Sequence, residues 1–284
     1  MDKKTIAWLK TTFPGVFNIV VKSPFITRLI LEFDRCRYIQ CRMLNKPYFG
    51  TICLAGQTWE ERKPWMIKLI VEESKRRQGN HFSLLEVGSW AGNSAVLWAE
   101  AIKANNSQAT VLCIDAWEPY MDVKDFDQTN VATQLMNEDL AKGKIFKLFL
   151  HNIKAAGHAD IIFPFKGSSN QLLPRLEKES FEIIYLDGDH RYQQFTQNLL
   201  NASRILKLGG VICGDDLDLT IEQIDQAYAI KNREVNVIVD PLTQQVFHPG
   251  ITLACHDFFK MPITSYHGFW ALRKTLTGWE QVVL

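Results

Sequence analysis

The chain has 284 residues, of which 46% are hydrophobic and 22% are charged, and its formal net charge at pH 7 is +1. This length suits one α/β domain with an extension, and a nearly neutral chain is a poor partner for nucleic acid. No apolar run reaches the roughly 18 residues of a transmembrane helix, and no signal peptide is expected. The six cysteines are scattered, without a Cys-x-x-Cys pair, which indicates a reducing, cytoplasmic compartment without disulfides or a zinc site.

Residues 1–57 are predicted to form a helical N-terminal extension, with a helix over 26–43 and a connecting loop over 45–57. Basic and aromatic residues are interspersed between Arg35 and Phe49, which is most simply the pattern of a solvated helix with one packed side. The alternatives are a subunit contact, a contact with a membrane surface, or a lid over a substrate. Thr58 and Glu61 fit a capping box, so we expect the next helix to start there and to end at Gly79.

From Phe82 onward, short apolar runs alternate with helical patterns, which is typical of a parallel, doubly wound sheet. Residues 217–248 are interpreted as an insertion, partly helical and partly extended. Two final strands, joined by a turn at Thr277-Gly278, would form a hairpin and give the sheet one antiparallel strand. The fold class is therefore α/β, with a mostly parallel seven-stranded sheet in a domain over 58–284. We expect strands at 82–87, 110–114, 160–165, 181–186, 211–214, 268–273 and 279–284, and helices at 94–104, 131–150, 170–177, 192–206 and 251–260.

The stretch from Leu84 to Ser94 joins a buried strand to a helix through a glycine turn. Small residues at such a turn let the backbone approach a ligand closely, and the following helix offers free N–H groups. Glu86 interrupts the apolar run, so we expect its side chain at the ligand crevice. A tight strand-to-helix turn without a ligand would produce the same pattern, so the other strand ends are needed to decide.

Polar residues gather where the predicted strands end, which is the edge at which α/β sheets bind ligands. Any one aspartate there could be a helix cap, but six acidic side chains at one edge would repel each other unless a cation bound among them. An acidic residue after the second strand can bind the hydroxyls of a ribose. The dinucleotide fingerprint would need glycines at positions 90 and 93, and these positions hold Trp90 and Asn93, which argues against NAD. The strand ends carry Glu86, Asp115, Gly167-Ser168-Ser169, Asp187-Gly188-Asp189-His190 and Asp215-Asp216.

These motifs together resemble those of the class I S-adenosylmethionine-dependent methyltransferases. Within that superfamily, the chain is similar to the metal-dependent O-methyltransferases that act on macrolide and other natural-product sugars, of the macrocin O-methyltransferase type. The resemblance covers about residues 80–284 and implies a Rossmann-like fold. Trp90 departs from the pattern, because a glycine is common at its position. The resemblance is carried by Glu86 to Gly92, Asp115, Leu186 to Tyr192, and Leu206 to Ile212 followed by Asp215-Asp216.

The resemblance also implies a role for each motif. Carboxylates suit Mg²⁺ or another divalent cation, and a carboxylate or imidazole can take the proton from an acceptor hydroxyl. His190 could equally be a structural helix cap, and His248 is a candidate residue on the substrate side. The implied cofactor-binding residues are Glu86, Gly88, Ser89, Gly92, Asp115, Ser168, Ser169 and Asp187; the implied metal ligands are Asp187, Asp215 and Asp216; and the implied catalytic residues are Asp189 and His190.

We therefore expect an S-adenosylmethionine-dependent O-methyltransferase, assisted by Mg²⁺, that methylates a hydroxyl of a sugar or a glycosylated small molecule. The N-terminal extension would contact the acceptor or a second copy in a homo-oligomer. The first alternative is a metal-independent small-molecule methyltransferase of the same fold. An NAD-dependent oxidoreductase and a non-enzymatic binding module are the remaining alternatives, and the acidic strand ends argue against the latter.

Overall fold

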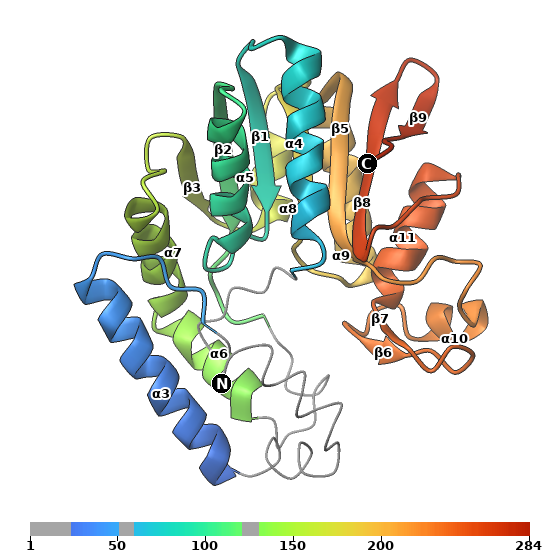
Figure 1. Cartoon of the computed structure of the whole chain (residues 1–284). Helices are drawn as coiled ribbons and strands as arrows, with labels where there is room; N and C mark the ends of the chain where they lie inside the picture. The colour runs from blue at the N-terminus through green and yellow to red at the C-terminus, as the bar shows by residue number, and fades with distance from the viewer. Residues whose placement is uncertain (1–23, 51–59, 121–130) are drawn as a thin grey trace.

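The computed structural model describes residues 24–50, 60–120 and 131–284, and these form a twisted sheet with helices on both faces (Figure 1). The sheet order is β3-β2-β1-β4-β5-β8-β9. The first five strands are parallel, and β8 runs antiparallel to both β5 and β9. The predicted fold class, including the one reversed strand, is confirmed. The strands are β1 Phe82–Val87, β2 Ala109–Asp115, β3 Ile162–Lys166, β4 Phe181–Leu186, β5 Leu206–Leu217, β8 Gly268–Thr275 and β9 Gly278–Gln281.

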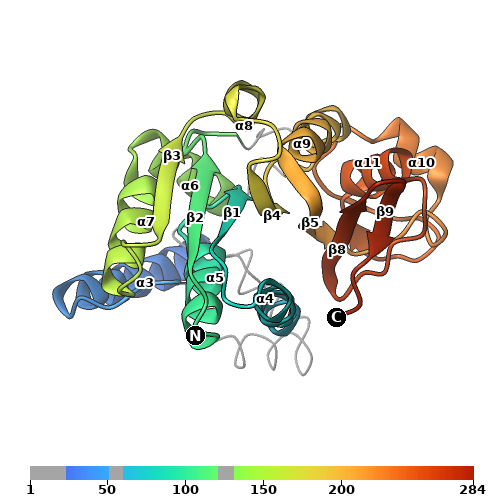
Figure 2. The same ribbon diagram turned by 90° about the horizontal axis from the view of Figure 1, so that it is seen from above.

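Two hydrophobic clusters, one on each face, hold the helices against the sheet. Because successive strand residues point to opposite faces, Leu84 packs into one cluster and Leu85 into the other. Helices α4, α5 and α7 contribute to the first cluster, and α9 and α11 to the second, as the view from above shows (Figure 2). The helices are α3 Pro24–Met43, α4 Lys63–Arg77, α5 Asn93–Ala104, α6 Val131–Ala141, α7 Lys144–Ala155, α8 Ser169–Leu172, α9 Tyr192–Ile205, α10 Gln226–Lys231 and α11 Pro249–Phe259, with a 3₁₀ turn at Leu173–Arg175.

Two of the predicted helices differ in the structure. The single helix expected over 131–150 is wrong, because Gly143 adopts φ +64° and separates α6 from α7. The start expected at Thr58 is also wrong. Helix α4 begins at Lys63 with Pro64 in its first turn, and its Arg62 cap makes no side-chain capping bond. Thr58 itself lies outside the described residues.

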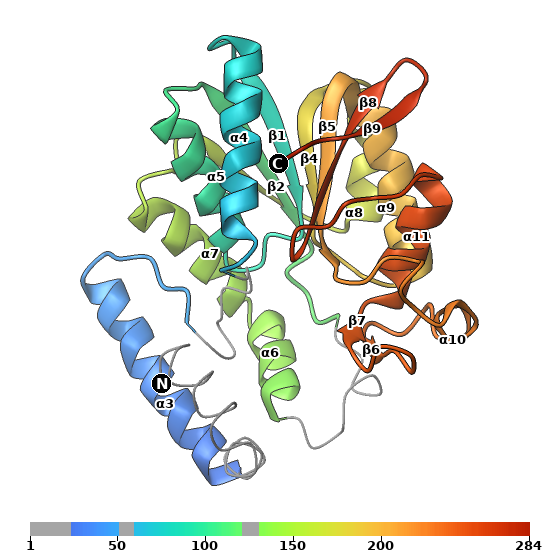
Figure 3. The same cartoon turned by 45° about the vertical axis from the view of Figure 1, so that its right-hand side comes forward.

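The segments outside the sheet lie at the carboxyl ends of the parallel strands. Figures 1 and 3 both show α6 and the small hairpin β6–β7 beyond this edge. The hairpin pairs Ile238–Val239 with Val246–Phe247, and it forms a second sheet apart from the main one. It packs on a separate hydrophobic cluster that includes Phe247 and Leu253. The insertion expected at 217–248 therefore lies where a ligand of the sheet would bind.

A buried asparagine fastens the chain after α3 to the glycine turn. The Asn152 side chain, on α7, accepts from Tyr48 N at 2.8 Å and donates to Tyr48 O at 2.9 Å. The same amide donates to Ala91 O at 2.8 Å. One fully buried side chain thus fixes the end of the N-terminal segment relative to the turn that follows β1.

The buried carboxylate of Glu73 holds α4 against the far strands of the sheet. Its oxygens lie 2.5 Å from Arg273 Nη2, on β8, and 3.0 Å from Arg77 Nη2. Arg273 also donates to Gly209 O of β5 at 2.8 Å. Because Glu73 is fully buried, its removal leaves partly buried guanidinium groups without their counter-charge.

We predict that Glu73→Ala lowers the free energy of unfolding by about 3 kcal/mol, since breaking one side of a buried ion pair is costly. Urea denaturation followed by circular dichroism measures this loss. The matched control is Glu72→Ala, which removes an exposed partner of Lys75 and should cost less than about 0.5 kcal/mol. Equal losses in the two variants would contradict the assignment.

Candidate cofactor and catalytic site

The turn after β1 is built on three residues with positive φ. Gly88 has φ +91°, and a side-chain Cβ there would lie 1.9 Å from Asp187 O, so only glycine fits. Gly92, the cap of α5, has φ +83° and packs against Phe149. Trp90 has φ +45°. Trp90 therefore keeps the left-handed backbone that a glycine would adopt, and its departure from the family pattern leaves this turn intact.

Glu86 is fully buried beneath this turn, close to Cys113. Among the described residues its Oε2 has no hydrogen-bond partner, and neither has the buried hydroxyl of Ser89. Burial raises the pKa of Glu86 to about 7, although the nearby polar groups of Ser89, Ser94 and Trp98 act in the opposite direction. Unsatisfied buried polar atoms are rare in folded proteins and call for a ligand or an ordered water.

Asp115 ends β2 and holds the adjoining loops by their backbones. Its Oδ2 accepts from Trp90 N at 2.8 Å and its Oδ1 from Trp117 N at 2.7 Å. The indole of Trp117 donates to Trp90 O at 2.8 Å. Burial raises the pKa of Asp115, against these backbone donors. Each oxygen retains a second lone pair, so the carboxylate can still accept from a ribose hydroxyl.

The two serines after β3 lie at the start of α8. Ser168 is the residue before the helix, and the hydroxyl of Ser169 donates to Asn198 Oδ1 at 2.9 Å. Gly167 N donates to Asp115 O at 2.8 Å, which places this loop beside the end of β2. Both serines therefore lie beside the Asp115 loop, and their contact with the adenine of a cofactor stays a prediction.

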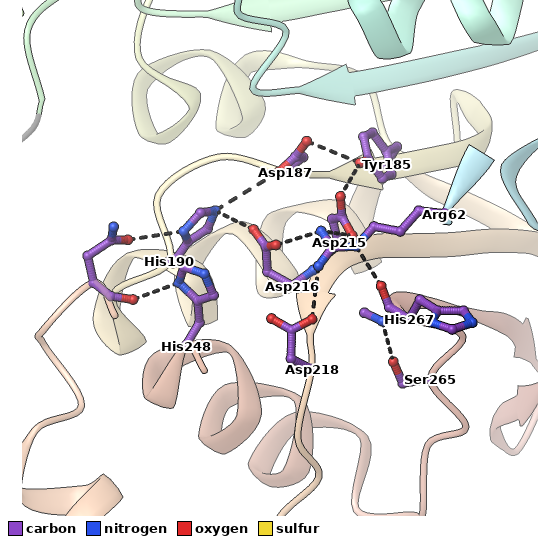
Figure 4. Close-up of polar contacts among 12 residues, drawn as sticks. Arg62, Tyr185, Asp187, His190, Asp215, Asp216, Asp218, His248, Ser265 and His267 are labelled. Atoms are coloured by element: carbon purple, nitrogen blue, oxygen red, sulfur yellow. Dashed lines mark hydrogen bonds and ion pairs between the residues drawn. The ribbon is translucent and has the colours of Figure 1, made fainter. Parts of the chain in front are cut away.

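The strand ends of β4 and β5 bring Asp187, Asp215 and Asp216 together, as expected from the sequence (Figure 4). Tyr185 links them, because its hydroxyl lies 3.1 Å from Asp187 Oδ2 and 3.3 Å from Asp215 Oδ2. Burial raises the pKa of Asp187 well above its usual range, and the neighbouring charges of Asp215 and Asp216 raise it further. Burial and Asp216 also raise the pKa of Asp215 to about 7, although Arg62 opposes this.

Arg62 is the cation that the sequence analysis did not find. Its Nη1 lies 2.5 Å from Asp215 Oδ1 and 2.6 Å from Asp216 Oδ1, and its Nη2 lies 2.9 Å from Asp218 Oδ1. Its Nε donates to His267 O at 2.6 Å. Only 6% of this side chain is exposed. The repulsion expected among the strand-end carboxylates is thus partly relieved by an arginine that precedes α4.

His190 lies on the other side of Asp216. Its Nε2 is 3.2 Å from Asp216 Oδ2 and its Nδ1 is 3.0 Å from Asn236 Oδ1. The His248 ring packs edge-on against it, with centroids 4.4 Å apart (Figure 4). Burial lowers the pKa of His190 to about 4. Burial opposes ionisation of Asp216 as well, but His190, His248 and Arg62 outweigh it and lower the pKa of Asp216 to about 2.

Asp189 is held by its neighbour rather than by the cluster. Its carboxylate accepts from Arg191 Nη2 at 2.6 Å, from Arg191 Nε at 2.9 Å and from Arg191 N at 3.0 Å. The pairing fixes the orientation of Asp189 in the loop after β4. Of the two predicted catalytic residues, His190 therefore points at Asp216 and Asn236, and Asp189 is bound to Arg191.

Known proteins of similar sequence or structure include methyltransferases. Residues 85–217 match the family model of a methyltransferase domain. The structure is similar to that of the O-methyltransferase NovP, with 15% identity, a TM-score of 0.51, and coverage of 76% of this chain and 80% of that one. An O-methyltransferase from Bacillus cereus in complex with SAH matches over 95% of this chain and 100% of its own, with 16% identity and a TM-score of 0.44. No curated protein sequence matched.

The raised pKa of Glu86 predicts a pH dependence of stability in the ligand-free protein. Between the unfolded pKa near 4.5 and the folded pKa of about 7, the folded state holds a proton that the unfolded state has lost. Folding is therefore favoured at the acidic end of this window, and stability falls as the pH rises through it. We expect Glu86→Gln to remove about 3 kcal/mol of that fall between pH 5 and pH 7.5.

Chemical denaturation at a series of pH values measures this slope. The control is Glu72→Gln, since Glu72 lies on the exposed side of α4 and pairs only locally with Lys75. An unchanged slope in Glu86→Gln would show that Glu86 does not hold the proton.

Proposed function

We propose, from the match of residues 85–217 to a methyltransferase domain, that this protein is a class I, S-adenosylmethionine-dependent methyltransferase and methylates a hydroxyl of a small molecule, with sugars and glycosides as the acceptor class. The observation that carries the proposal is the position of two unsatisfied buried polar atoms, Glu86 Oε2 and Ser89 Oγ. They lie under the turn that contacts the Asp187 backbone, next to the strand-end carboxylates.

The proposed cofactor contacts follow the order of the strands. Glu86, Gly88, Ser89 and Gly92 would hold the amino-acid end, because the turn offers close backbone approach and the carboxylate can accept from an ammonium group. Asp115 would accept from the ribose, and Ser168 and Ser169 would lie beside the adenine. Asp187 stands between this surface and the cluster. The cofactor supplies an electrophilic methyl group, and the chain positions the acceptor oxygen against it.

An acceptor rich in hydroxyl groups suits the cluster, because an ionised carboxylate accepts hydrogen bonds without donating any and can bind several hydroxyls at once. Asp189 is the residue that we propose takes the proton, since Arg191 holds its carboxylate in one orientation. His190 is less available to a hydroxyl, because both of its ring nitrogens already face other side chains. The free cysteines among the described residues are consistent with the cytoplasmic compartment proposed from the sequence.

The Mg²⁺ site proposed on Asp187, Asp215 and Asp216 fits these residues poorly. Asp215 Oδ1 contacts Arg62 and accepts from Asp216 N, and its Oδ2 faces the Tyr185 hydroxyl. Arg62 Nη1 also donates a hydrogen bond to Asp216 Oδ1. A Mg²⁺ ion bound to Asp215 Oδ1 and Asp216 Oδ1 would lie next to the positively charged guanidinium of Arg62 and would be repelled by it. The contacts of Arg62 with these oxygens favour the first alternative from the sequence, a small-molecule methyltransferase of the same fold that works without Mg²⁺.

The segments outside the sheet are proposed to determine the acceptor or the oligomer. Helix α3 and the residue after it expose Phe33, Ile39, Met43 and Leu44, which supports a contact with an acceptor or a second copy. No helix among residues 24–50, 60–120 and 131–284 is long and apolar enough to cross a membrane.

We predict that the protein binds S-adenosylhomocysteine and not NAD in calorimetric titrations. Asp115→Ala should weaken the binding by about 1.5–3 kcal/mol for each ribose hydrogen bond to the carboxylate that is lost. Asp160→Ala is the control, because Asp160 is exposed and pairs with Lys103. Tight NAD binding without a response to S-adenosylhomocysteine would refute the methyltransferase proposal. Equal affinity in Asp115→Ala, with an unchanged melting temperature, would move the ribose site elsewhere.

We predict that Asp189→Asn lowers kcat by roughly 10²–10⁴-fold, since the amide cannot take the proton. The assay follows formation of S-adenosylhomocysteine with the best acceptor from a panel of sugars and glycosides. Cofactor affinity should stay unchanged, because Asp189 lies in the acceptor-side loop. Asp257→Asn, which alters an exposed partner of Tyr192, is the control. Full turnover in Asp189→Asn would mean that another group takes the proton.

A further inference from the structure

We propose that His190, Asp216 and His248 form a site for a divalent transition-metal ion such as Zn²⁺, Fe²⁺ or Mn²⁺. One potential ligand atom from each residue lies within 4.8 Å of the other two. The residues come from three separate places in the fold: the loop after β4, the end of β5 and the N-cap of α11 (Figure 4). The site shares Asp216 with the three-aspartate arrangement and differs from it in using two imidazoles in place of the other two carboxylates.

Asn236 prepares both imidazoles for this role. Its side-chain oxygen lies 3.0 Å from His190 Nδ1, and its backbone oxygen lies 2.7 Å from His248 Nδ1. Both oxygens are acceptors, so in the neutral form each ring donates from Nδ1 and has its lone pair on Nε2. This is the usual arrangement around a metal, where a ligating histidine donates its other N–H to a carbonyl or carboxylate.

The contact between His190 and Asp216 also calls for a cation. With its proton on Nδ1, His190 directs the lone pair of Nε2 at Asp216 Oδ2, only 3.2 Å away. A lone pair facing a carboxylate at this distance is repulsive unless positive charge lies between them. A metal ion bound by both atoms would turn this repulsion into coordination.

Asp216 has one oxygen for each cation. Its Oδ1 contacts Arg62 Nη1 at 2.6 Å, and its Oδ2 faces His190. Asp215 and Asp218 also face Arg62. Asp216 adopts φ +61°, an uncommon backbone conformation for a residue other than glycine, and such strain is concentrated at functional sites. The left-handed backbone at Asp216 is thus part of the arrangement in which the two oxygens serve different partners.

The donor set decides the class of metal. Imidazole nitrogens suit Zn²⁺, iron, copper and nickel, and two histidines with one carboxylate form a set that leaves coordination positions open. Mg²⁺ prefers oxygen ligands and keeps its waters, so it is disfavoured here. A metal ion with an open position could contact an acceptor bound at this edge of the sheet. The contact between a metal and the acceptor rests on the proposed methyl transfer. The binding of a metal to His190, Asp216 and His248 does not rest on it.

The test uses the full-length protein, stripped with a chelator and titrated with Co²⁺ as the probe. Calorimetry and the visible absorption of Co²⁺ report the stoichiometry and the ligand field. We expect one equivalent to bind, with competition by Zn²⁺ and not by Mg²⁺. His190→Gln and His248→Gln should each abolish this binding. The matched control is His256→Gln, because His256 is an exposed histidine on α11, the helix that His248 caps.

Variants of Asn236 test whether the hydrogen bond to His190 Nδ1 contributes to Co²⁺ binding. Asn236→Ala removes the side-chain acceptor for His190 and should weaken Co²⁺ binding by about 10–100-fold, whereas Asn236→Asp retains an acceptor and should restore it. Thermal unfolding of every variant shows that each is folded. Absence of Co²⁺ binding, or binding that survives both histidine substitutions and is lost in Asp187→Asn, would overturn the site.

Titration with S-adenosylhomocysteine on the same samples separates the two proposals. Cofactor binding without Co²⁺ binding would overturn the metal site and leave the methyltransferase proposal standing. Co²⁺ binding that depends on both histidines would support the site, whatever the outcome of the cofactor titration.

Discussion

Arg62 carries a buried positive charge into the carboxyl edge of the sheet, and the rest of the site is arranged around it. Two of its nitrogens contact three aspartates, and the third donates to a backbone carbonyl. Burying carboxylates without a counter-charge is costly, because water no longer stabilises the ionised form. The close approach of Asp215 and Asp216 is therefore tolerable only because α4 begins where it does. That start is held in turn by the packing of α4 and by the ion pair of Glu73 with Arg273 on β8.

The architecture could be predicted from the sequence because it depends on local patterns. Short apolar runs predicted the strands of the parallel sheet. The polar residues after these runs predicted the edge of the sheet at which the site lies. Helix boundaries were less predictable. Gly143, which follows Lys142 in a stretch of helical pattern, separates α6 from α7, and a glycine after a basic residue is a usual helix-stop signal. The hydrophobic periodicity continues on both sides of Gly143, and the pattern therefore predicted one helix instead of two.

The site itself was only partly predictable, and the reason is distance along the chain. Arg62 contacts Asp216 across 154 positions, and no motif near Arg62 marks it. The repulsion argument required a cation, but one arginine among 32 basic residues cannot be chosen by charge alone. The same holds for Asn236, which comes from the insertion and touches His190 across 46 positions. Trp90 illustrates the opposite case, since the residue type departs from the family pattern and the backbone conformation is kept.

Protonation links the cofactor side of the site to the acceptor side. Burial raises the pKa values of both Glu86 and Asp215 to about 7, and Asp187 is shifted in the same direction. In the absence of further cations, burial and the neighbouring carboxylates favour protons on these groups, because one guanidinium cannot balance all of the carboxylates. Any positive group that arrives, whether a sulfonium, an ammonium or a metal ion, favours the ionised forms and displaces those protons. The carboxyl edge is thus a surface whose charge depends on its ligands, with Asp216 held in its ionised form by its contact with Arg62.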